Sequence, residues 1–386
     1  MESVKKNIRK YLIKYLSNIR ARKIANVYHR KVSKIQLDKD SLIDNEIVKL
    51  HREKWRRIYK RKVNLRWLYW YFYNTGINSP DFVPESIYYS IIEPVLNKSE
   101  FCQTYSDKNF YDLFYDDFLF PEILLRNIDG YFFNKDYQVV NIDNDNLLMN
   151  FFIGIDRFIL KPSLESGGGT NVKYFRLNNG KYISADGDIL TVKFLMDIFE
   201  ENYVIQDIIH QNRFFSQFNP ISLNTIKVFT YRSPITNKIH ILHCLLRVGQ
   251  ENKYIDSTRA GGFVIGINKY GELNKYAVTR NGLTKVDKCF SKINGIDLEP
   301  GIKIPFFDKI LETSIAIAGR NIHHRLLGLD MAVDQMDNIR CLEVNNMGNA
   351  INSFQLNNGP LFGEFTDEVI EYCRLNKHQL YSNYNF

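Results

Sequence analysis

The chain has 386 residues, of which 45% are hydrophobic, 14% aromatic and 24% charged, and its formal net charge is +8. This composition excludes an intrinsically disordered chain, because its apolar surface is sufficient to offset the entropy lost on ordering. The length predicts two or three packed subdomains rather than one small core. Five widely spaced cysteines without a CxxC pair argue against a disulfide framework or a zinc knuckle and favour a reducing compartment.

No stretch of the sequence approaches the roughly 20 uninterrupted apolar residues that a bilayer span needs. The N-terminus also lacks the short apolar core and small-residue cleavage site of a secretion signal. We therefore expect a cytoplasmic protein.

Basic charge is concentrated at the start of the chain. Residues 1–62 hold 20 Lys/Arg and 6 Asp/Glu, a balance of +14, whereas the remainder holds 31 and 37, a balance of −6. Such a basic arm ahead of a mildly acidic body predicts that the arm meets a polyanion. Within the arm, apolar residues recur at three- and four-residue steps and predict a helix with an apolar stripe: Val4, Ile8, Tyr11, Leu12, Tyr15, Leu16 and Ile19.

Three interpretations of the arm remain open. The stripe could lie in an anionic membrane, with Lys5, Lys6, Arg9, Lys10 and Lys14 near the phosphate headgroups, which predicts a peripheral protein at the inner face of the membrane. The helix could instead pack on its own protein. Nucleic acid ranks last, because the aromatic run from Trp67 to Tyr73 is more typical of packing than of stacking on bases.

The pattern of elements changes along the chain. Residues 1–75 predict helices, residues 74–80 the first clear loop, and Ser106 or Asp107 the start of another helix that ends before Pro121, where a strand follows. From residue 150 onward we expect helices at 191–201 and 306–323 among short strands: FFIGI, RFILKP, YVIQDII, TIKVFTY, IHILHCLLRVG, GGFVIGI and IRCLEVN. The fold class is therefore α+β, with strands mostly in meanders.

A glycine loop follows one of the predicted strands, in RFILKPSLESGGGTNVKYF. The backbone N–H groups of Gly167, Gly168 and Gly169 can close over an anion, which the Lys161 ammonium can also reach. The order of lysine and glycines differs from that of a Walker A loop. The stretch predicts a phosphate clamp, with a simple tight turn as the alternative.

An acidic hairpin is predicted near the C-terminus, in LGLDMAVDQMDNIRCLEVNN. Glu343 and Asn345 alternate on one strand, and Asp330 on the facing strand can join them. Carboxylate and amide oxygens are the ligands that Mg²⁺ prefers. These residues predict a magnesium site, unless they only face solvent.

The order of lysine, glycine loop, YVIQDII, NTIKV, LLRVG, DSTRAGG and LGLDMAV…CLEVNN resembles the ATP-grasp superfamily, and more closely its sugar-transfer associated branch. The likeness covers about residues 100–365 and includes SDKNFYDLF followed by FPEILL. It implies an ATP-grasp fold of two α+β subdomains that grip ATP. The expected parts are a basic, mainly helical region at 1–95, the first part of the core at 96–150, a lid subdomain at 151–215, and a C-terminal subdomain with the metal site at 216–386.

The resemblance also implies roles for individual residues. Lys108 and Lys161 would face the ATP phosphates, with Lys161 and Arg247 catalytic and Asn224 beside Arg247 on the phosphate and acyl side. Lys227 stands where the branch usually has arginine, Ser257 follows Asp256 where asparagine is commoner, and His210 is assigned no catalytic role. The lid over the phosphates would be Ser166, Gly167, Gly168 and Gly169. The hinge that holds adenine would be Gln206, Asp207, Ile208 and Ile209. The magnesium ligands would be Asp330, Glu343 and Asn345.

The activity that the resemblance implies is that of an ATP- and Mg²⁺-dependent carboxylate-amine ligase, which forms an amide through an acyl phosphate and releases ADP. The implied substrates come from surface-polysaccharide or capsule assembly, for example a sugar carboxylate joined to an amino acid or amine, and a lipid-linked glycan would suit the basic arm. Two alternatives stay open: a sugar or hydroxyl kinase of the same fold, and a non-catalytic, membrane-docked nucleotide-binding adaptor.

Overall fold

The computed structural model describes residues 2–35, 43–164, 171–254, 256, 261–281, 285–299 and 301–381. Within these ranges the side chains of residues 2–6, 9–10, 280–281, 285–290, 379 and 381 are not described. Several predictions from the sequence lie outside the described residues: the lid residues Ser166, Gly167, Gly168 and Gly169, Ser257, and the side chains of Val4, Lys5, Lys6, Arg9 and Lys10.

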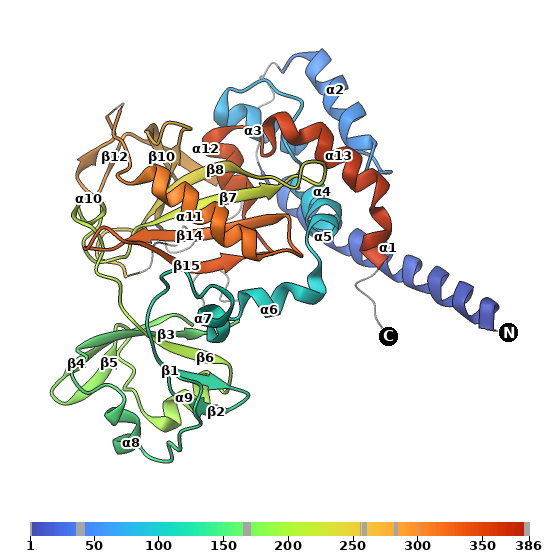
Figure 1. Cartoon of the computed structure of the whole chain (residues 1–386). Helices are drawn as coiled ribbons and strands as arrows, with labels where there is room; N and C mark the ends of the chain where they lie inside the picture. Colours follow the sequence, from blue (N-terminus) through green and yellow to red (C-terminus); the bar gives the residue numbers. More distant parts are fainter. Residues whose placement is uncertain are drawn as a thin grey trace.

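Two antiparallel sheets form the body of the molecule, as the α+β prediction requires. In Figure 1 the smaller sheet lies below the larger one, and the N- and C-terminal helices gather at the right. The six-stranded sheet has the order β2-β1-β6-β3-β4-β5, with the bounds β1 Ile123–Ile128, β2 Tyr131–Phe133, β3 Arg157–Pro162, β4 Lys173–Asn178, β5 Lys181–Ser184 and β6 Tyr203–Asp207. Because β1 and β2 share this sheet with β3 to β6, the boundary expected at residue 150 separates strands of one sheet.

The seven-stranded sheet has the order β11-β10-β9-β8-β7-β14-β15. Strands β7 to β11 form a meander, and the β14–β15 hairpin joins it beside β7. The bounds are β7 Thr225–Arg232, β8 Ile239–Val248, β9 Phe263–Ile267, β10 Leu273–Asn281, β11 Lys285–Phe290, β14 Leu326–Val333 and β15 Ile339–Asn345, with the separate pair β12 Lys292–Ile293 and β13 Ile296–Asp297.

Helices cover both faces of the larger sheet. Helix α11 packs on one face, where Ile226, Leu246 and Leu329 are buried in one core cluster. Helix α12 and the helices before residue 97 cover part of the other face around Phe229 and Leu245. The helices are α1 Glu2–Ser33, α2 Asn45–Arg56, α3 Arg66–Thr75, α4 Glu85–Ile87, α5 Glu93–Leu96, α6 Cys102–Ser106, α7 Tyr111–Phe114, α8 Asp145–Asn150, α9 Val192–Ile198, α10 Arg213–Ser216, α11 Phe307–Arg320, α12 Ile351–Asn358 and α13 Thr366–Leu375.

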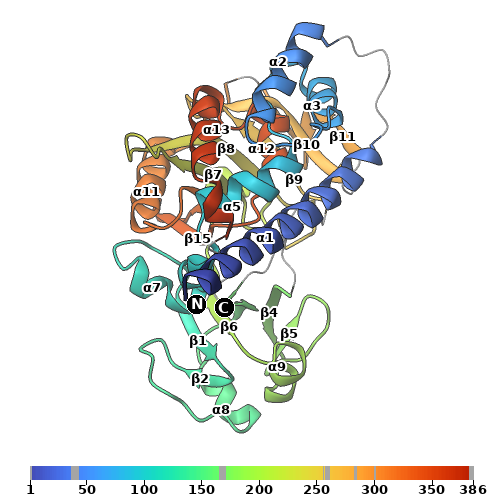
Figure 2. The ribbon, with the colours of Figure 1, turned by 90° about the vertical axis from the view of Figure 1, so that its right-hand side faces the viewer.

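Shorter helical segments accompany these helices. They are the π-helix η1 (Tyr88–Ile92) and the 3-10 helices η2 (Ser99–Phe101), η3 (Lys108–Phe110), η5 (Gly363–Phe365) and η6 (Lys377–Tyr381). Helix α1 lies against α4, η1 and η6, and Figure 2 shows it crossing the molecule as a long diagonal. The aromatic run of α3 packs internally, since Trp67, Trp70 and Tyr71 are buried, as the sequence predicted.

Three element predictions were wrong. The chain already leaves the helices at residues 57–65, between α2 and α3, before the loop expected at 74–80. The FFIGI run is a turn rather than a strand, because Phe152 enters the core of the small lobe and Tyr182 Oη donates to the Phe152 carbonyl at 2.9 Å. The helix expected from residue 106 to Pro121 is broken into η3 and α7 and ends at Phe114. The Asp107 carboxylate caps only this short turn, by accepting from Asn109 N at 2.9 Å. Across the described ranges no helix combines the length and apolar character needed to cross a bilayer.

Candidate active site

Most of the predicted site residues line one cavity of about 1060 Å³, which is bordered by strands of both sheets. These are Lys108, Lys161, Gln206, Asp207, Ile208, Ile209, Arg247, Asp330, Glu343 and Asn345. The structure therefore brings Lys161 and the acidic hairpin residues to the same space, although they are far apart in the sequence.

Strand alternation explains why the charged residues of the larger sheet share a face. Ile226 and Val228 pack toward α11, so Lys227 between them points to the opposite face. Arg247 and Asp330 also lie between apolar neighbours that pack toward α11, so their side chains point to the same opposite face as Lys227. The register places Asp330 directly opposite Lys227 on one side and opposite Glu343 on the other.

Asp330 is the centre of a buried ion-pair network. Its Oδ1 lies 2.9 Å from Lys227 Nζ, and its Oδ2 lies 3.2 Å from Arg247 Nη1. The other end of the Arg247 guanidinium contacts Asp256 Oδ1 at 2.9 Å, and the Thr225 hydroxyl donates to Asp256 Oδ2. The guanidinium is thus held as a fork between two carboxylates.

The carboxylates of the hairpin are ionised despite their burial. Burial raises the pKa of Asp330, but the Lys227 and Arg247 charges and hydrogen bonds outweigh it, so the net pKa is below the ordinary value. For Glu343, burial and the Asp330 charge raise the pKa, but the Lys108 and Lys161 charges outweigh them, and the net pKa is lowered. Both groups are therefore anions at neutral pH.

Two lysines approach the hairpin from the side of the smaller sheet. Lys108 is nearly fully buried, and its Nζ lies 2.9 Å from Glu343 Oε1 and donates to the Ser163 carbonyl at 3.3 Å. Lys161 lies on β3, paired with Val204 of β6. Burial, and then the Lys108 charge, lower the pKa of Lys161 to about 8. An anion in the cavity would relieve this unfavourable concentration of positive charge.

The predicted adenine hinge is the end of β6 and the segment after it. Gln206 is buried between Ile123 of β1 and Ile159 of β3. Ile208 N donates to Asp207 Oδ1 at 2.8 Å, so this N–H is already engaged. The segment Gln206 to Ile209 nevertheless lines the cavity as a continuous wall.

The donor set of the hairpin fits a magnesium ion. Two ionised carboxylates, Asp330 and Glu343, face each other across the strands, and Asn345 follows on the same face. Asn345 Nδ2 is buried without a hydrogen-bond partner among the described residues, and a flip of that amide presents its oxygen in the same place. The described residues contain no cluster of three His, Cys, Asp or Glu side chains that could hold a metal, so any magnesium would need phosphate oxygens and water to complete its shell.

One predicted residue is not on the cavity wall. Asn224 is buried in the loop before β7, and its Nδ2 donates to the carbonyls of Phe215 and Asn219 and to Gln211 Oε1. Its neighbours Leu223 and Thr225 line the cavity instead. His210, for which the sequence predicted no catalytic role, also lines the cavity, and its carbonyl accepts from Gln335 N at 2.7 Å.

Several contributors to the cavity were missed. Lys227 was noted only as a departure from a family pattern, although the alternation of TIKVFTY already predicts that it faces away from Ile226 and Val228. Asp256 had no signal in the sequence beyond its position in DSTRAGG. Tyr254 lies beside it and stacks on Tyr174 of β4 at 4.6 Å between ring centroids, which joins the two lobes over the cavity. Helix α1 is a further contributor, since three of its residues line the same cavity.

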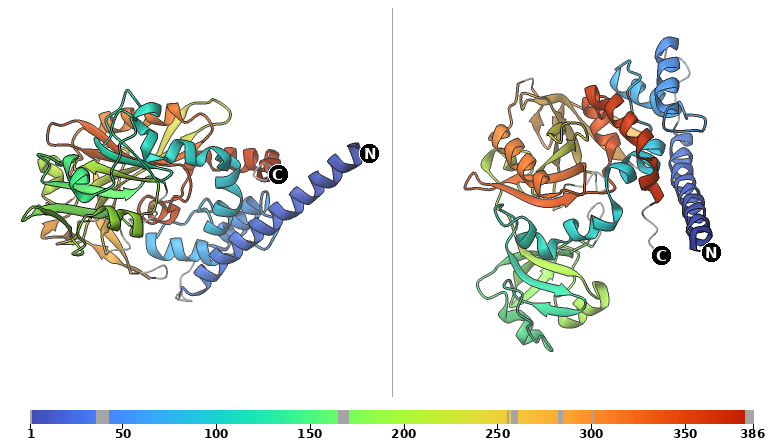
Figure 3. Two further views of the ribbon diagram at one scale, coloured as in Figure 1. Left: turned by 90° about the horizontal axis from the view of Figure 1, so that it is seen from below. Right: turned by 45° about the vertical axis from the view of Figure 1, so that its right-hand side comes forward.

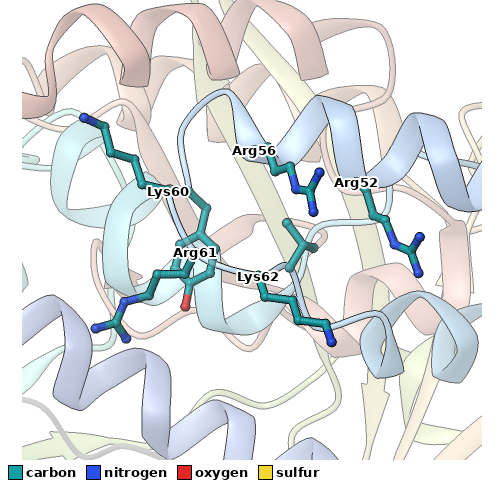
Figure 4. A pocket seen from close by; sticks show the side chains of 7 residues that line it. Arg52, Arg56, Lys60, Arg61 and Lys62 are labelled. Atoms are coloured by element: carbon teal, nitrogen blue, oxygen red, sulfur yellow. The ribbon is translucent and has the colours of Figure 1, made fainter.

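A second, smaller cavity of about 780 Å³ lies in the basic N-terminal region. Figure 4 shows Arg52 and Arg56 on α2 above Arg61 and Lys62 on the following loop. On the other side of α2, Lys54 and Arg57 form salt bridges with Asp367. Within the described ranges no salt bridge involves the lining residues Arg52, Arg56, Lys60, Arg61 or Lys62.

Gly328 gives a test of the packing at the site. A Cβ at this position would stand 2.1 Å from Asn349 Oδ1 and 3.3 Å from Lys227 Cε, so Gly328→Ala must displace both side chains. We expect a loss of about 1–3 kcal/mol in the free energy of unfolding and weaker nucleotide binding. The matched control is Gly319→Ala in α11, where a Cβ meets nothing within 4 Å. Equal thermal stability of the two variants would contradict the described packing.

Lys161 gives a test by pH. Its pKa is about 8 in the folded protein, against the ordinary value of 10.5. The unfolded chain therefore binds more protons between these values, and this group's penalty on stability is full below pH 8 and disappears as the pH rises toward 10.5. Lys161→Met should raise Tm at pH 7 without nucleotide and reduce the rise of Tm with pH, while weakening ATP binding.

The control for this experiment is Lys173→Met on the neighbouring strand. The Lys173 ammonium donates to the Asp186 and Asp188 carboxylates, and these hydrogen bonds raise the pKa of Lys173, so its removal should lower Tm instead. Thermal melts of the three proteins between pH 7 and about pH 10.5 measure both effects. A lower Tm for Lys161→Met at pH 7 would show that its ammonium is well paired in the free protein, and would contradict the prediction.

Comparison with known proteins agrees with the expected family. The model of the family described as sugar-transfer associated ATP-grasp matches residues 96–369. No curated protein matches the chain.

Several solved structures are similar to the chain at low identity. The ATP-grasp ligase PsnB, complexed with minimal precursor, Mg and ADP, is 12% identical with a TM-score of 0.38, over 72% of this chain and 62% of that one. The D-alanine–D-alanine ligase from Bacillus anthracis is 12% identical with a TM-score of 0.38, over 72% of this chain and 68% of that one. D-alanyl-alanine synthetase A from Vibrio cholerae O1 is 10% identical with a TM-score of 0.39, over 71% of this chain and 65% of that one. The chain thus spans less than two thirds of the PsnB ligase, and at such TM-scores these similarities do not bear on the assignment.

The family match alone carries the assignment, and it extends over well more than half of the chain. Membership supports ATP binding in general terms. The chain belongs to the sugar-transfer associated ATP-grasp family.

Proposed function

We propose that the protein is an ATP- and Mg²⁺-dependent ligase that joins a carboxylate to an amine through an acyl phosphate and releases ADP. The observation that carries this proposal is the convergence of Lys108, Lys161, Arg247 and the Asp330–Glu343 pair on one cavity. A triphosphate needs cations along its oxygens and a metal with hard oxygen ligands, and this cavity offers both kinds of group.

The lysines act on the phosphates. Lys108 would exchange its contact with Glu343 for a phosphate oxygen, and Lys161 would approach from β3. Charge builds on the transferring phosphoryl group, and two ammonium groups in a buried site stabilise it without much reorganisation. Asp330, Glu343 and Asn345 would hold magnesium, which would supply further neutralisation of the phosphate charge.

Arg247 and Lys227 would bind the carboxylate substrate. One carboxylate oxygen attacks the γ-phosphorus, the bond to ADP breaks, and an acyl phosphate forms. The amine nitrogen then attacks the acyl carbon, inorganic phosphate leaves and the nitrogen loses one proton. Arg247, already held between Asp330 and Asp256, is oriented to donate to the oxyanion of this second step.

The proposed substrates are a sugar carboxylate and an amino acid or other amine, used in the assembly of a surface polysaccharide. The support is the family's description as sugar-transfer associated. A kinase that phosphorylates a sugar hydroxyl is the second candidate, since the same groups would bind MgATP. The adaptor alternative needs no turnover at all.

Product analysis distinguishes these candidates. Incubation with ATP, Mg²⁺, uronic acids and amino acids should give ADP only when carboxylate and amine are both present. Phosphorylated sugar without an amine requirement would favour the kinase, and AMP would require an acyl adenylate and contradict the scheme. Glu343→Gln should lower turnover at least 100-fold, on the order of the effect of losing one transition-state contact. Glu364→Gln, at an exposed position, is the control.

We also propose that residues 1–62 bind an anionic membrane. The N-terminal half of α1 projects from the body (Figures 1 and 3), and Ile8, Tyr11, Leu12 and Tyr15 there are 55–72% exposed. The rest of the helix packs on the protein, with Ala25 and Val32 buried. Exposed apolar residues, together with a cavity lined by basic side chains, suit phospholipid headgroups better than nucleic acid.

Vesicle binding tests the membrane proposal. The full chain should bind phosphatidylglycerol vesicles and not phosphatidylcholine vesicles, and binding should weaken with salt. Tyr11→Glu combined with Tyr15→Glu should weaken binding at least tenfold, and so should Arg52→Glu combined with Arg56→Glu. Ile235→Glu, at a residue that is 77% exposed in the turn between β7 and β8, is the control. Binding that is unchanged in both double variants would rule the proposal out.

A further inference from the structure

The large cavity continues beyond the charged residues to a wall that the family core does not supply. Ile24, Val27 and Tyr28 of α1 line it, together with Tyr89 of η1 and Glu93 of α5. All five precede residue 96, where the family match begins. We call the part of the cavity bounded by these residues and by residues 347–350 the α1 compartment.

The wall is fixed to the core by specific contacts. The Tyr28 and Tyr89 rings stack with centroids 4.3 Å apart. Tyr89 Oη donates to the Asn349 carbonyl at 2.6 Å, and Gly348 N donates to Glu93 Oε1 at 2.9 Å. The end of α1 is also held, since Arg66 Nε donates to the Val32 carbonyl at 3.1 Å. A compartment held in this way is formed before any ligand arrives.

The compartment adjoins the position where the acyl group would react. Asn349 Nδ2 donates to the Asn345 carbonyl at 3.3 Å. The Asn349 side chain and Lys227 lie together over Gly328, which has no Cβ to separate them. A molecule in the α1 compartment would therefore lie beside the acyl group that Lys227 and Arg247 are proposed to hold.

The two parts of the cavity differ in charge. None of the cations among the described lining residues is one of the residues that bound the α1 compartment, although Lys227 lies beside Asn349; these cations are Lys108, Arg157, Lys161, Lys227 and Arg247. In the α1 compartment the charged lining residue is Glu93, with a residue exposure of 3%, amid the apolar side chains of Ile24, Val27 and Met347. Lys31, which does not line the cavity, places its ammonium 4.3 Å from the Tyr28 ring centroid, so that ring already has a cation partner. Glu93 is thus the group that would recognise a ligand charge.

We infer that the α1 compartment binds the amine substrate, with its ammonium group near Glu93 and an apolar body along Ile24 and Val27. This inference rests on the proposed ligase function and adds to it the class of amine, a primary amine on an apolar carbon skeleton. It also gives the N-terminal region a role in substrate choice. A carboxylate next to an apolar wall discriminates such an amine from a neutral analogue by charge and from a polar amine by desolvation.

Calorimetry with a matched pair of probes tests the inference on the full chain without ATP. Phenethylamine and 2-phenylethanol share their body and differ in the charged group, and the wild type should bind the amine at least tenfold more tightly. Glu93→Gln keeps an acceptor for Gly348 N and should reduce this preference to less than threefold. Val27→Trp, at a residue that is 43% exposed and so has room for a larger side chain, should fill the compartment and weaken both probes at least tenfold.

The controls separate this inference from the proposed function. Ile153→Trp, at a residue that is 79% exposed in another part of the chain, should bind both probes like the wild type. A fluorescent ATP analogue should bind Val27→Trp within twofold of the wild type. Equal binding of the two probes to the wild type, or probe binding unaffected by Val27→Trp, would overturn the inference even if amide formation were observed. Loss of probe binding in Val27→Trp would support it even if no ATP turnover were found.

Discussion

The pairing of β14 with β7 and β15 is the constraint on which the rest of the site depends. It places Asp330 opposite Lys227 and opposite Glu343 at once, so three charged side chains from separate strands share one face of the sheet. A shift of β14 by one residue would turn Asp330 into the core against α11, away from Lys227 and Glu343. The bulge after Asp330 keeps Cys341 and Val344 in that core while Glu343 and Asn345 stay on the cavity side.

A buried charge cluster of this kind is not justified by stability. Four cations, Lys108, Lys161, Lys227 and Arg247, face the carboxylates Asp256, Asp330 and Glu343. Burial disfavours the charged form of Lys161, Arg247, Asp256, Asp330 and Glu343. Burial, and then the Lys108 charge, leave Lys161 with a lowered pKa, whereas the hairpin carboxylates remain ionised. The cluster is therefore complementary to an anion that carries its own cation, which is the charge pattern of a metal-bound triphosphate.

Local patterns in the sequence were sufficient to predict part of this site. A lysine before a glycine loop, and an alternating Glu343–Asn345 strand facing Asp330, depend on neighbours in one hairpin, and the structure has both strand pairings. The FFIGI run was wrongly predicted as a strand because a buried turn and a buried strand have the same apolar composition. Asn224 misled because a buried amide can satisfy carbonyls in its own loop as well as a ligand. The α1 wall could not be predicted at all, since it depends on contacts between residues more than 250 positions apart, such as Tyr89 and Asn349.

A crystal structure of the protein with Mg²⁺ and a non-hydrolysable ATP analogue tests the central claim most directly. We expect β- and γ-phosphate oxygens about 3 Å from Lys108 Nζ and Lys161 Nζ, metal on Asp330, Glu343 and Asn345, and adenine against the segment Gln206 to Ile209. A nucleotide bound instead at the Arg52–Arg56 cavity, with Lys108 still on Glu343, would contradict the claim.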